Sequence, residues 1–424
     1  MDHRDKNVIV LGRGKTGRAV EKYLTGRGAK VETADDHDEK TTLETVLSHT
    51  YDYAVVSPGI PLDHYPVIRL KECGVPVLSE LDLAFLECAS KSVAAISGTN
   101  GKTTTCTILR DLLSTVGRCH LVGNVGVPWI GEVARIGKSD FVVVETSSFQ
   151  IEQSQLFRPR IAALTNVGED HLDRHLTVEV YQRLKLSLLD RAEIKVVNIG
   201  DPPQRDIKGA ITYSGSDPSA DYFLSGGVIY HRGKKYNLPT SSRGAAYDLD
   251  YLCAFTVAAT FCGIKKSFLS LYDKVKLPSF RMEYVGDLCG AKIFNDSKGT
   301  NIDATLFAVR QCKEPLALIL GGSDKGEDFS RLFRSLGDHV KRIYLTGGNV
   351  CAIYEAAEGR FREKCRLVES LQAAVLDFIS DPLPILLFSP ASASFDRYRN
   401  YEERGRCFNE IIKEYGGKRD DARL

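Results

Sequence analysis

The 424-residue chain lacks any strong charge imbalance and any long apolar run. Lysine and arginine number 56 against 55 aspartates and glutamates, so bulk attraction to nucleic acid or to an anionic membrane is excluded as a basis of function. The sequence contains no run of 18 apolar residues and no signal-peptide pattern. We therefore expect a cytoplasmic protein that does not insert into membranes.

Cysteine pairs at metal-binding or redox spacing are also missing. The eleven cysteines are scattered from Cys73 to Cys407 without any C-x-x-C spacing, which favours free thiols in a reducing compartment. Hydrophobic residues make up 43% of the chain and charged residues 26%, an ordinary globular balance. The length allows about three domains.

The most informative segment is a glycine-rich turn between an apolar run and a helical pattern. Residues 93–96 predict a buried strand, and the periodicity of residues 106–116 predicts a helix. The turn between them, Gly98-Thr-Asn-Gly-Lys-Thr103, is typical of loops whose N–H groups hold a polyphosphate at a helix N-terminus. Lys102 is expected to contact the outer phosphates and Thr103 to bind Mg²⁺. A plain strand-to-helix turn is the alternative.

The spacing of this loop is shorter than usual. Ile96 stands where the common P-loop pattern has its first glycine, which disfavours an ordinary P-loop GTPase or kinase. The protein is nevertheless predicted to consume a nucleoside triphosphate.

Strand, glycine-rich turn and helix follow one another three times, at residues 8–17, 93–116 and 316–326. This alternation predicts an α/β fold with parallel sheets covered by helices. We predict three domains, residues 1–91, 92–278 and 279–424. A small antiparallel meander is expected over residues 201–244 of the central domain.

The first glycine cluster permits two interpretations. Gly12-x-Gly14-x-x-Gly17 after a strand, followed by Asp35, matches a dinucleotide-binding fingerprint, so an NAD-dependent dehydrogenase is a rival hypothesis. Hydride transfer leaves the phosphate loop unexplained. A domain for a nucleotide-diphosphate substrate beside a domain for ATP accounts for both segments.

Polar side chains follow other predicted strands. Glu145 ends the apolar run 141–144, and His171 lies in a polar segment after the strand 161–165. Because the carboxyl ends of parallel strands meet at one edge of a sheet, both residues are candidate Mg²⁺ ligands. A contact to a substrate phosphate is the alternative for His171. A helix cap or an exposed acid is the alternative for Glu145.

Two later regions have the composition of anion sites. Residues 295–301 (Asn-Asp-Ser-Lys-Gly-Thr-Asn) follow a strand-like run, and Lys325 follows the next one. Residues 389–394 place small hydroxyl side chains ahead of a helix predicted to carry Tyr398 and Tyr401. Such a site suits a carboxylate, although capping of the last helix would account for one serine.

Together these segments resemble the Mur ligases. Residues 98–103 and Glu-Asp-His at 169–171 are general to that family, and five further segments resemble its D-glutamate-adding branch: residues 12–17, 57–60, 145–150, 295–301 and 389–395. The resemblance implies a Rossmann-like UDP domain, a central ATPase domain and a Rossmann-like C-terminal domain. It also implies ATP-dependent addition of D-glutamate to UDP-N-acetylmuramoyl-L-alanine through an acyl phosphate, in peptidoglycan synthesis. The alternatives are another Mur-type or folylpolyglutamate-type amide ligase and a non-enzymatic nucleotide-binding switch.

The resemblance also implies site residues. The residues implied to bind the UDP-linked substrate are Lys15, Thr16, Asp35, Ser57, Asn124 and Ser147. The residues implied to bind ATP are Gly98, Thr99, Asn100, Gly101, Lys102, Thr103, Thr104, Arg281 and Asp296. The D-glutamate pocket comprises Thr300, Lys325, Ser394, Phe395 and Tyr401.

Catalysis and metal binding are implied for a smaller group. Lys102 is catalytic, together with Glu145, His171 and Lys185. Two Mg²⁺ ions are expected on Thr103, Glu145, His171 and Lys185, the last as a carbamate. A monomer is expected.

The chain departs from the family pattern at two places. The histidine that precedes Arg281 in the family is missing, and residues 247–251 lack the asparagines that contact adenine. Asp248 is the candidate for that contact.

Overall fold

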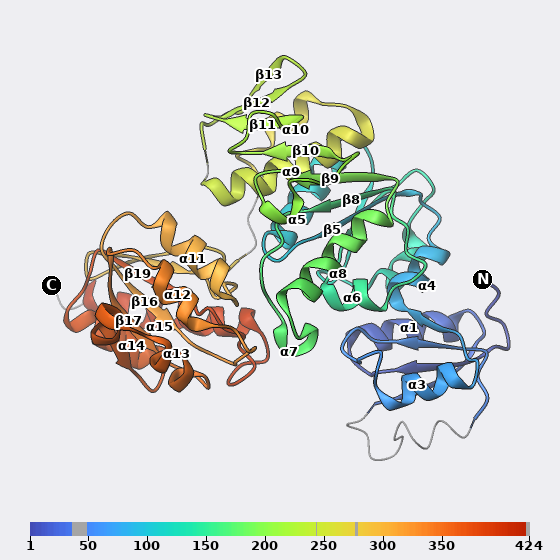
Figure 1. The fold of residues 1–424 in the computed structure, drawn as a ribbon, viewed down its shortest axis with the longest axis horizontal. Helices are drawn as coiled ribbons and strands as arrows, with labels where there is room; N and C mark the ends of the chain where they lie inside the picture. The colour runs from blue at the N-terminus through green and yellow to red at the C-terminus, as the bar shows by residue number, and fades with distance from the viewer. Residues whose placement is uncertain (36–48, 243, 276–278, 421–424) are drawn as a thin grey trace. The chain divides into compact units, whose positions relative to one another are not determined.

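The computed structural model describes residues 1–35, 49–242, 244–275 and 279–420 (Figure 1). It contains three β-sheets with helices on their faces, which confirms the predicted α/β fold with parallel sheets. The chain forms two compact units, Met1–Val167 with Gln182–Lys276, and Gly168–Tyr181 with Leu277–Leu424. No helix in the described ranges is long and apolar enough to cross a membrane.

The first sheet is parallel, in the order β2-β1-β3-β4. Its strands are β1 (Asn7–Leu11), β2 (Lys30–Ala34), β3 (Tyr53–Val56) and β4 (Val77–Ser79), with helices α1 (Lys15–Gly26), α3 (Tyr65–Glu72) and α4 (Glu80–Glu87). Val8 to Leu11 are all buried because a parallel sheet is covered on both faces.

The central sheet has nine strands in the order β13-β12-β11-β10-β9-β8-β5-β7-β6. The strands are β5 (Ser92–Ser97), β6 (Cys119–Gly123), β7 (Phe141–Glu145), β8 (Ile161–Leu164), β9 (Ile194–Asn198), β10 (Ile211–Ser214), β11 (Tyr222–Ser225), β12 (Val228–His231) and β13 (Lys234–Asn237). The pairs from β6 through β11 are parallel. Only β11-β12-β13 is antiparallel, so the predicted meander over 201–244 is shorter than expected and continues this sheet.

Helices cover both faces of the central sheet. They are α5 (Lys102–Ser114), α6 (Ser148–Gln153), α8 (Val178–Asp190), α9 (Ala245–Cys262) and α10 (Lys266–Ser270), with 3₁₀ turns η1 (Trp129–Gly131), η2 (Val133–Arg135) and η3 (Pro202–Gln204). α5 packs on α9 over one face. The core on the other face is continuous with that of the first sheet, since Phe85, Trp129 and Phe157 meet edge to face or tilted between them. This shared core joins the first two sheets into one compact unit.

The third sheet has the order β14-β15-β19-β16-β17-β18. Its strands are β14 (Glu283–Leu288), β15 (Ala291–Asn295), β16 (Leu316–Leu320), β17 (Val340–Leu345), β18 (Cys365–Leu367) and β19 (Ile385–Phe388). Only β14 is antiparallel to its neighbour. The helices are α11 (Ile302–Gln311), α12 (Phe329–Ser335), α13 (Val350–Ala356), α14 (Leu371–Ser380) and α15 (Tyr401–Asp420), with the 3₁₀ turn η4 (Gly359–Lys364). Short α7 (Leu172–His175) also belongs to this unit.

The predicted domain boundaries stay predictions. Residue 91 directly precedes β5, and the boundary at 278 lies outside the described residues. The last helix begins at Tyr401, so Tyr398 lies in the loop before it and the prediction that α15 carries Tyr398 was wrong.

Candidate active site

The turn between β5 and α5 has a backbone that only glycine fits. Gly98 has φ +145° and Gly101 has φ +83°. A Cβ atom at Gly98 would lie 2.0 Å from Thr165 Oγ1, and one at Gly101 would lie 2.2 Å from Asp250 Oδ1. Both glycines are therefore required by close packing as well as by backbone conformation.

Asn166, which follows β8, holds this turn in place. Its backbone oxygen accepts from Thr99 N at 2.8 Å and its side-chain oxygen from Asn100 N at 3.0 Å. Its Nδ2 donates to Asn100 O at 3.1 Å. The turn leads into α5, whose N-cap Gly101 offers no side-chain acceptor. The N–H groups of the first helical turn therefore have no acceptor within the helix and suit an anion.

Lys102 extends over the turn. Its Nζ donates to Gly98 O at 2.8 Å and to Thr99 O at 2.7 Å. A flexible ammonium held by loop carbonyls lies at the same helix terminus as those N–H groups. The predicted ATP residues Gly98 to Thr104 are thus one continuous strand-turn-helix element.

Glu145 ends β7, the neighbour of β5. The side chain is buried, and its Oε1 accepts from Asn124 Nδ2 at 2.9 Å. Oε2 has no hydrogen-bond partner among the described residues, and neither has the buried Thr104 Oγ1. A buried carboxylate oxygen without a donor is costly unless a cation approaches it, so this carboxylate fits Mg²⁺.

Lys185 lies in α8 and is 1% exposed. Its Nζ is 3.5 Å from Oγ of Ser97, the last residue of β5. A lysine predicted only by resemblance is therefore buried beside the strand that enters the phosphate loop. The described residues contain no group of three histidine, cysteine, aspartate or glutamate side chains arranged for a metal. Mg²⁺ here would rely on few protein ligands together with phosphate oxygens, as it commonly does.

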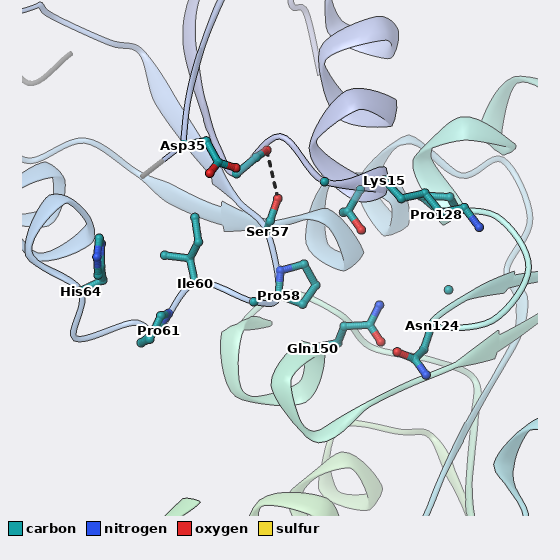
Figure 2. A pocket seen from close by; sticks show the side chains of 15 residues that line it. Lys15, Asp35, Ser57, Pro58, Ile60, Pro61, His64, Asn124, Pro128 and Gln150 are labelled. Carbon is teal, nitrogen blue, oxygen red and sulfur yellow. Dashed lines mark hydrogen bonds between the residues drawn. The ribbon is translucent and has the colours of Figure 1, made fainter. Parts of the chain in front are cut away.

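A cavity of about 580 Å³ lies at the carboxyl ends of the first-sheet strands (Figure 2). Loops of the first sheet line one side, and Asn124, Pro128 and Gln150 line the other. Five of the six predicted UDP-substrate residues line it: Lys15, Thr16, Asp35, Ser57 and Asn124. A diphosphate suits this wall because α1 begins there at Lys15.

Ser147, the sixth residue, is not among the lining residues. It is the N-cap of α6, where its hydroxyl accepts from Gln150 N. Gln150 and His64 line the cavity and were missed by the sequence analysis. The Ser147-x-x-Gln150 spacing is a capping box, a structural signal that hides a second role for Gln150.

In the second unit, two loops meet around Asp296 and Arg404. Asp296 Oδ2 accepts from Ser389 Oγ at 2.7 Å. Burial raises the pKa of Asp296 to about 6, against the lowering effect of Ser389 and Arg281. Arg404 donates to Ser297 O at 2.9 Å and to Ser392 O at 3.0 Å. The predicted ATP residue Asp296 is thus a buried link between the loops after β15 and β19.

Asp170 and Lys325 form a buried ion pair in the same unit. Lys325 Nζ lies 3.0 Å from Asp170 Oδ1, and Asn301 Nδ2 donates to Oδ2 at 3.2 Å. Burial opposes ionisation of Asp170, but Lys325 and His171 outweigh it and lower the pKa to about 2. His171 is the N-cap that precedes α7 and has φ +54°, and its Nε2 is 3.7 Å from Asp170 Oδ2.

The other predicted D-glutamate residues lie on loops of this unit, except Tyr401, which is the first residue of α15. Thr300 lies between β15 and α11, and Tyr401 is stacked under Lys298, whose Nζ is 5.2 Å from the ring centroid. Ser394 is buried, whereas Phe395 is 74% exposed. Asp248 in α9 is bonded to Ser242 Oγ and to the Tyr272 hydroxyl.

Two protein-family models match the chain. The Mur ligase middle domain matches residues 96–258, and the Mur ligase glutamate ligase domain matches residues 280–382. The chain is 34% identical to the UDP-N-acetylmuramoylalanine--D-glutamate ligase of Pelotomaculum thermopropionicum, covering 97% of this chain and 98% of that protein. It is 32% identical to the enzyme of the same name from Caldicellulosiruptor bescii, covering 98% and 99%.

The chain belongs to the Mur ligase family. This assignment confirms the resemblance and excludes the dehydrogenase alternative. Two solved structures of Mur ligases share the fold at 16% identity and TM-score 0.63. They are the Thermotoga maritima UDP-N-acetylmuramate-alanine ligase MurC, covering 96% of this chain and 99% of that one, and the T. maritima MurF ligase in complex with ADP, covering 98% and 96%.

The two matched ranges contain different predicted site residues. The middle domain includes the phosphate loop, Glu145 and Lys185, and the glutamate ligase domain includes Asp296 and Lys325. All residues of the first-sheet part that line the cavity lie outside both ranges.

Proposed function

We propose that this Mur ligase joins D-glutamate to UDP-N-acetylmuramoyl-L-alanine at the expense of ATP in peptidoglycan synthesis. The assignment of these substrates is supported by similarity over nearly the full chain to relatives named UDP-N-acetylmuramoylalanine--D-glutamate ligase. The main structural support for the mechanism is the hydrogen bond from Asn124 to Glu145. Asn124 lines the substrate cavity, and Glu145 lies at the end of the strand next to the one that enters the phosphate loop, so this bond links the two places.

The reaction begins with transfer of the γ-phosphoryl group. The alanyl carboxylate of the UDP-linked substrate attacks the γ-phosphorus, giving an acyl phosphate and ADP. The amine of D-glutamate then attacks the acyl carbon, and phosphate leaves from a tetrahedral intermediate to form the amide. The protein contributes positioning and charge stabilisation.

Residues of the phosphate loop stabilise the transferring group. The N–H groups at the start of α5 bind phosphate oxygens, and Lys102 moves from the loop carbonyls to the outer phosphates. Thr103 and Glu145 would hold Mg²⁺, which when bound would neutralise phosphate charge, and His171 is a candidate ligand for a second ion. Arg281 and Asp296 are also proposed to contact ATP.

Lys185 is proposed to act as a carbamate. Its side chain is buried beside the strand that enters the phosphate loop. Addition of CO₂ to the neutral amine, with loss of a proton, replaces the lysine ammonium by a carboxylate-like anion. Such an anion can approach Mg²⁺ where an ammonium cannot.

D-Glutamate is proposed to bind on the second unit. Thr300, Lys325 and Ser394 supply hydroxyl and ammonium donors for a dicarboxylate, with Phe395 and Tyr401 beside them. The UDP part is proposed to occupy the cavity lined by Lys15, Thr16, Asp35, Ser57 and Asn124, with Ser147 near the alanyl end. A nucleotide-linked precursor and ATP support a cytoplasmic location. A monomer is proposed.

The test measures phosphate release by the purified chain with ATP, Mg²⁺, UDP-N-acetylmuramoyl-L-alanine and each of a panel of amino acids. Release is expected only when the UDP-linked substrate and D-glutamate are both present, with one ADP formed per amide. Equal or greater turnover with another amino acid would assign a different Mur-type acceptor. Hydrolysis that is independent of the acceptor would contradict the proposal.

A further inference from the structure

Gln153, the last residue of α6, binds a loop of the first sheet. The residue is 3% exposed. Nε2 donates to Ser57 O at 3.1 Å and to Ile60 O at 2.6 Å. These two carbonyls are the first and last of the turn Ser57-Pro58-Gly59-Ile60, which Ile60 N closes on Ser57 O at 3.0 Å. One amide group therefore ties both ends of this turn to α6.

This turn is a large part of the cavity wall. All four of its residues, and Pro61 after it, line the cavity. Gln150 lines the cavity from α6, one helical turn before Gln153. Residues three apart lie on the same side of a helix, so Gln150 faces the cavity while Gln153 fastens the opposite wall to the same helix. The separation of the two walls therefore depends on Gln153.

The orientation of the Gln153 amide is fixed by its neighbours. A flipped amide would direct its oxygen at two carbonyl oxygens, which repel it. In the observed orientation, the buried Oε1 has no hydrogen-bond partner among the described residues. An unpaired buried acceptor lowers stability. The residue is thus poorly explained as a contribution to folding alone.

A neighbouring contact has the opposite character. Asp82 of α4 accepts from Ser154 Oγ at 2.6 Å, Leu156 N at 2.8 Å and Phe157 N at 3.0 Å. These bonds attach the segment after α6 to the first sheet, and none of their donors lines the cavity. Asp82 provides a structural reference against which Gln153 can be compared.

We infer that Gln153 is a positioning residue for the UDP-linked substrate, holding the turn 57–60 at the distance from α6 that the substrate requires. The inference rests on the proposed function and deepens it. Gln153 itself does not line the cavity, so it acts through the turn.

The test compares Gln153→Met with wild type. Methionine has a similar length and removes both donors and the unpaired acceptor. Calorimetric binding of UDP-N-acetylmuramoyl-L-alanine in the absence of ATP should weaken about tenfold, the size expected for two lost hydrogen bonds that hold the site. The KM for this substrate should rise in parallel, while the KM values for ATP and D-glutamate and the melting temperature stay unchanged.

Controls separate the possible results. Gln155→Met makes the same chemical change at an exposed residue and should bind like wild type. Asp82→Asn should lower the melting temperature without a selective effect on this KM. Gln153→Asn keeps the amide but is too short to reach both carbonyls, and it serves if Gln153→Met does not fold.

Equal binding by wild type and Gln153→Met would overturn the inference, as would a parallel rise of all three KM values with a lower melting temperature. Failure of wild type itself to bind the UDP-linked substrate would instead overturn the proposed function.

Discussion

Asn124 donates a hydrogen bond from Nδ2 to Oε1 of Glu145 across 2.9 Å. Asn124 N also donates to Glu145 O at 2.9 Å. The side chain that lines the cavity is therefore fastened to the carboxylate at the end of β7. A bound substrate would contact Asn124. The position of the substrate can therefore influence the orientation of the Glu145 carboxylate, which is proposed to hold Mg²⁺.

Glu145→Gln should reduce the affinity for Mg²⁺ while it leaves this hydrogen bond in place. The glutamine oxygen still accepts from Asn124, but the negative charge is gone. We expect the Mg²⁺ concentration for half-maximal ADP formation to rise about tenfold, equivalent to about 1.4 kcal/mol. Magnesium titration of initial rates measures it, with exposed Glu193→Gln as the control. An unchanged titration would remove Glu145 from the metal site.

Lys102→Ala should abolish ADP formation. The ammonium at the helix terminus stabilises charge on the transferring phosphoryl group, and loss of one such group commonly lowers kcat at least about a hundredfold. Initial rates of ADP release with both substrates present measure the effect. Lys274→Ala, at an exposed position, is the control. Full turnover by Lys102→Ala would refute the role.

Lys185→Ala should be inactive and regain activity with acetate or propionate. The alanine leaves space in which a small carboxylate can replace the carbamate, and rates are measured against carboxylate concentration. Lys185→Met fills that space and should not respond. In wild type, removal of dissolved CO₂ should lower the rate, and bicarbonate should restore it. Lack of rescue together with CO₂-independent activity would contradict carbamate formation.

Glu80→Gln should flatten the pH dependence of stability. Glu80 is 2% exposed and accepts from Ile130 N at 2.8 Å. Burial raises its pKa from 4.5 to about 7, against the lowering effect of the Ile130 and Trp129 N–H groups. Between these pH values the folded chain binds more protons than the unfolded chain. The free energy of unfolding therefore falls as the pH rises, by about 3 kcal/mol in total.

Melting temperatures at pH 5 and pH 8 measure this effect. The difference between them should shrink in Glu80→Gln, whose amide oxygen still accepts from Ile130 N. The variant should exceed wild type in stability at pH 8. Exposed Glu193→Gln should retain the wild-type difference. A pH dependence identical to wild type would show that Glu80 ionises normally.

Local patterns in the sequence predicted much of the sheet edge around the phosphate loop. Uninterrupted apolar runs identified β5 and β7, because strands buried on both faces do not alternate. The glycines of the turn signalled a backbone that other residues cannot adopt. The position of Glu145 at the carboxyl end of β7 then followed from its place directly after the apolar run.

Other features depend on contacts between distant residues and leave no local signal. Lys185 reads as an ordinary helix lysine, and only the resemblance marked it. The glutamine at 153 equally reads as a surface residue, although it is buried. The meander was predicted to begin too early in the chain, because residues 211–213 pair in parallel with β9. A short alternating pattern does not specify which strand is the partner.

The second compact unit is discontinuous, since Gly168–Tyr181 packs with residues that begin only at Leu277. The ribosome therefore synthesises Asp170 long before its partner Lys325 leaves the exit tunnel. Until then, the nascent segment carries an acidic side chain without its ammonium partner, and this unit cannot complete its folding before the third sheet has been synthesised. Premature termination before the third sheet would leave the segment permanently without its native packing.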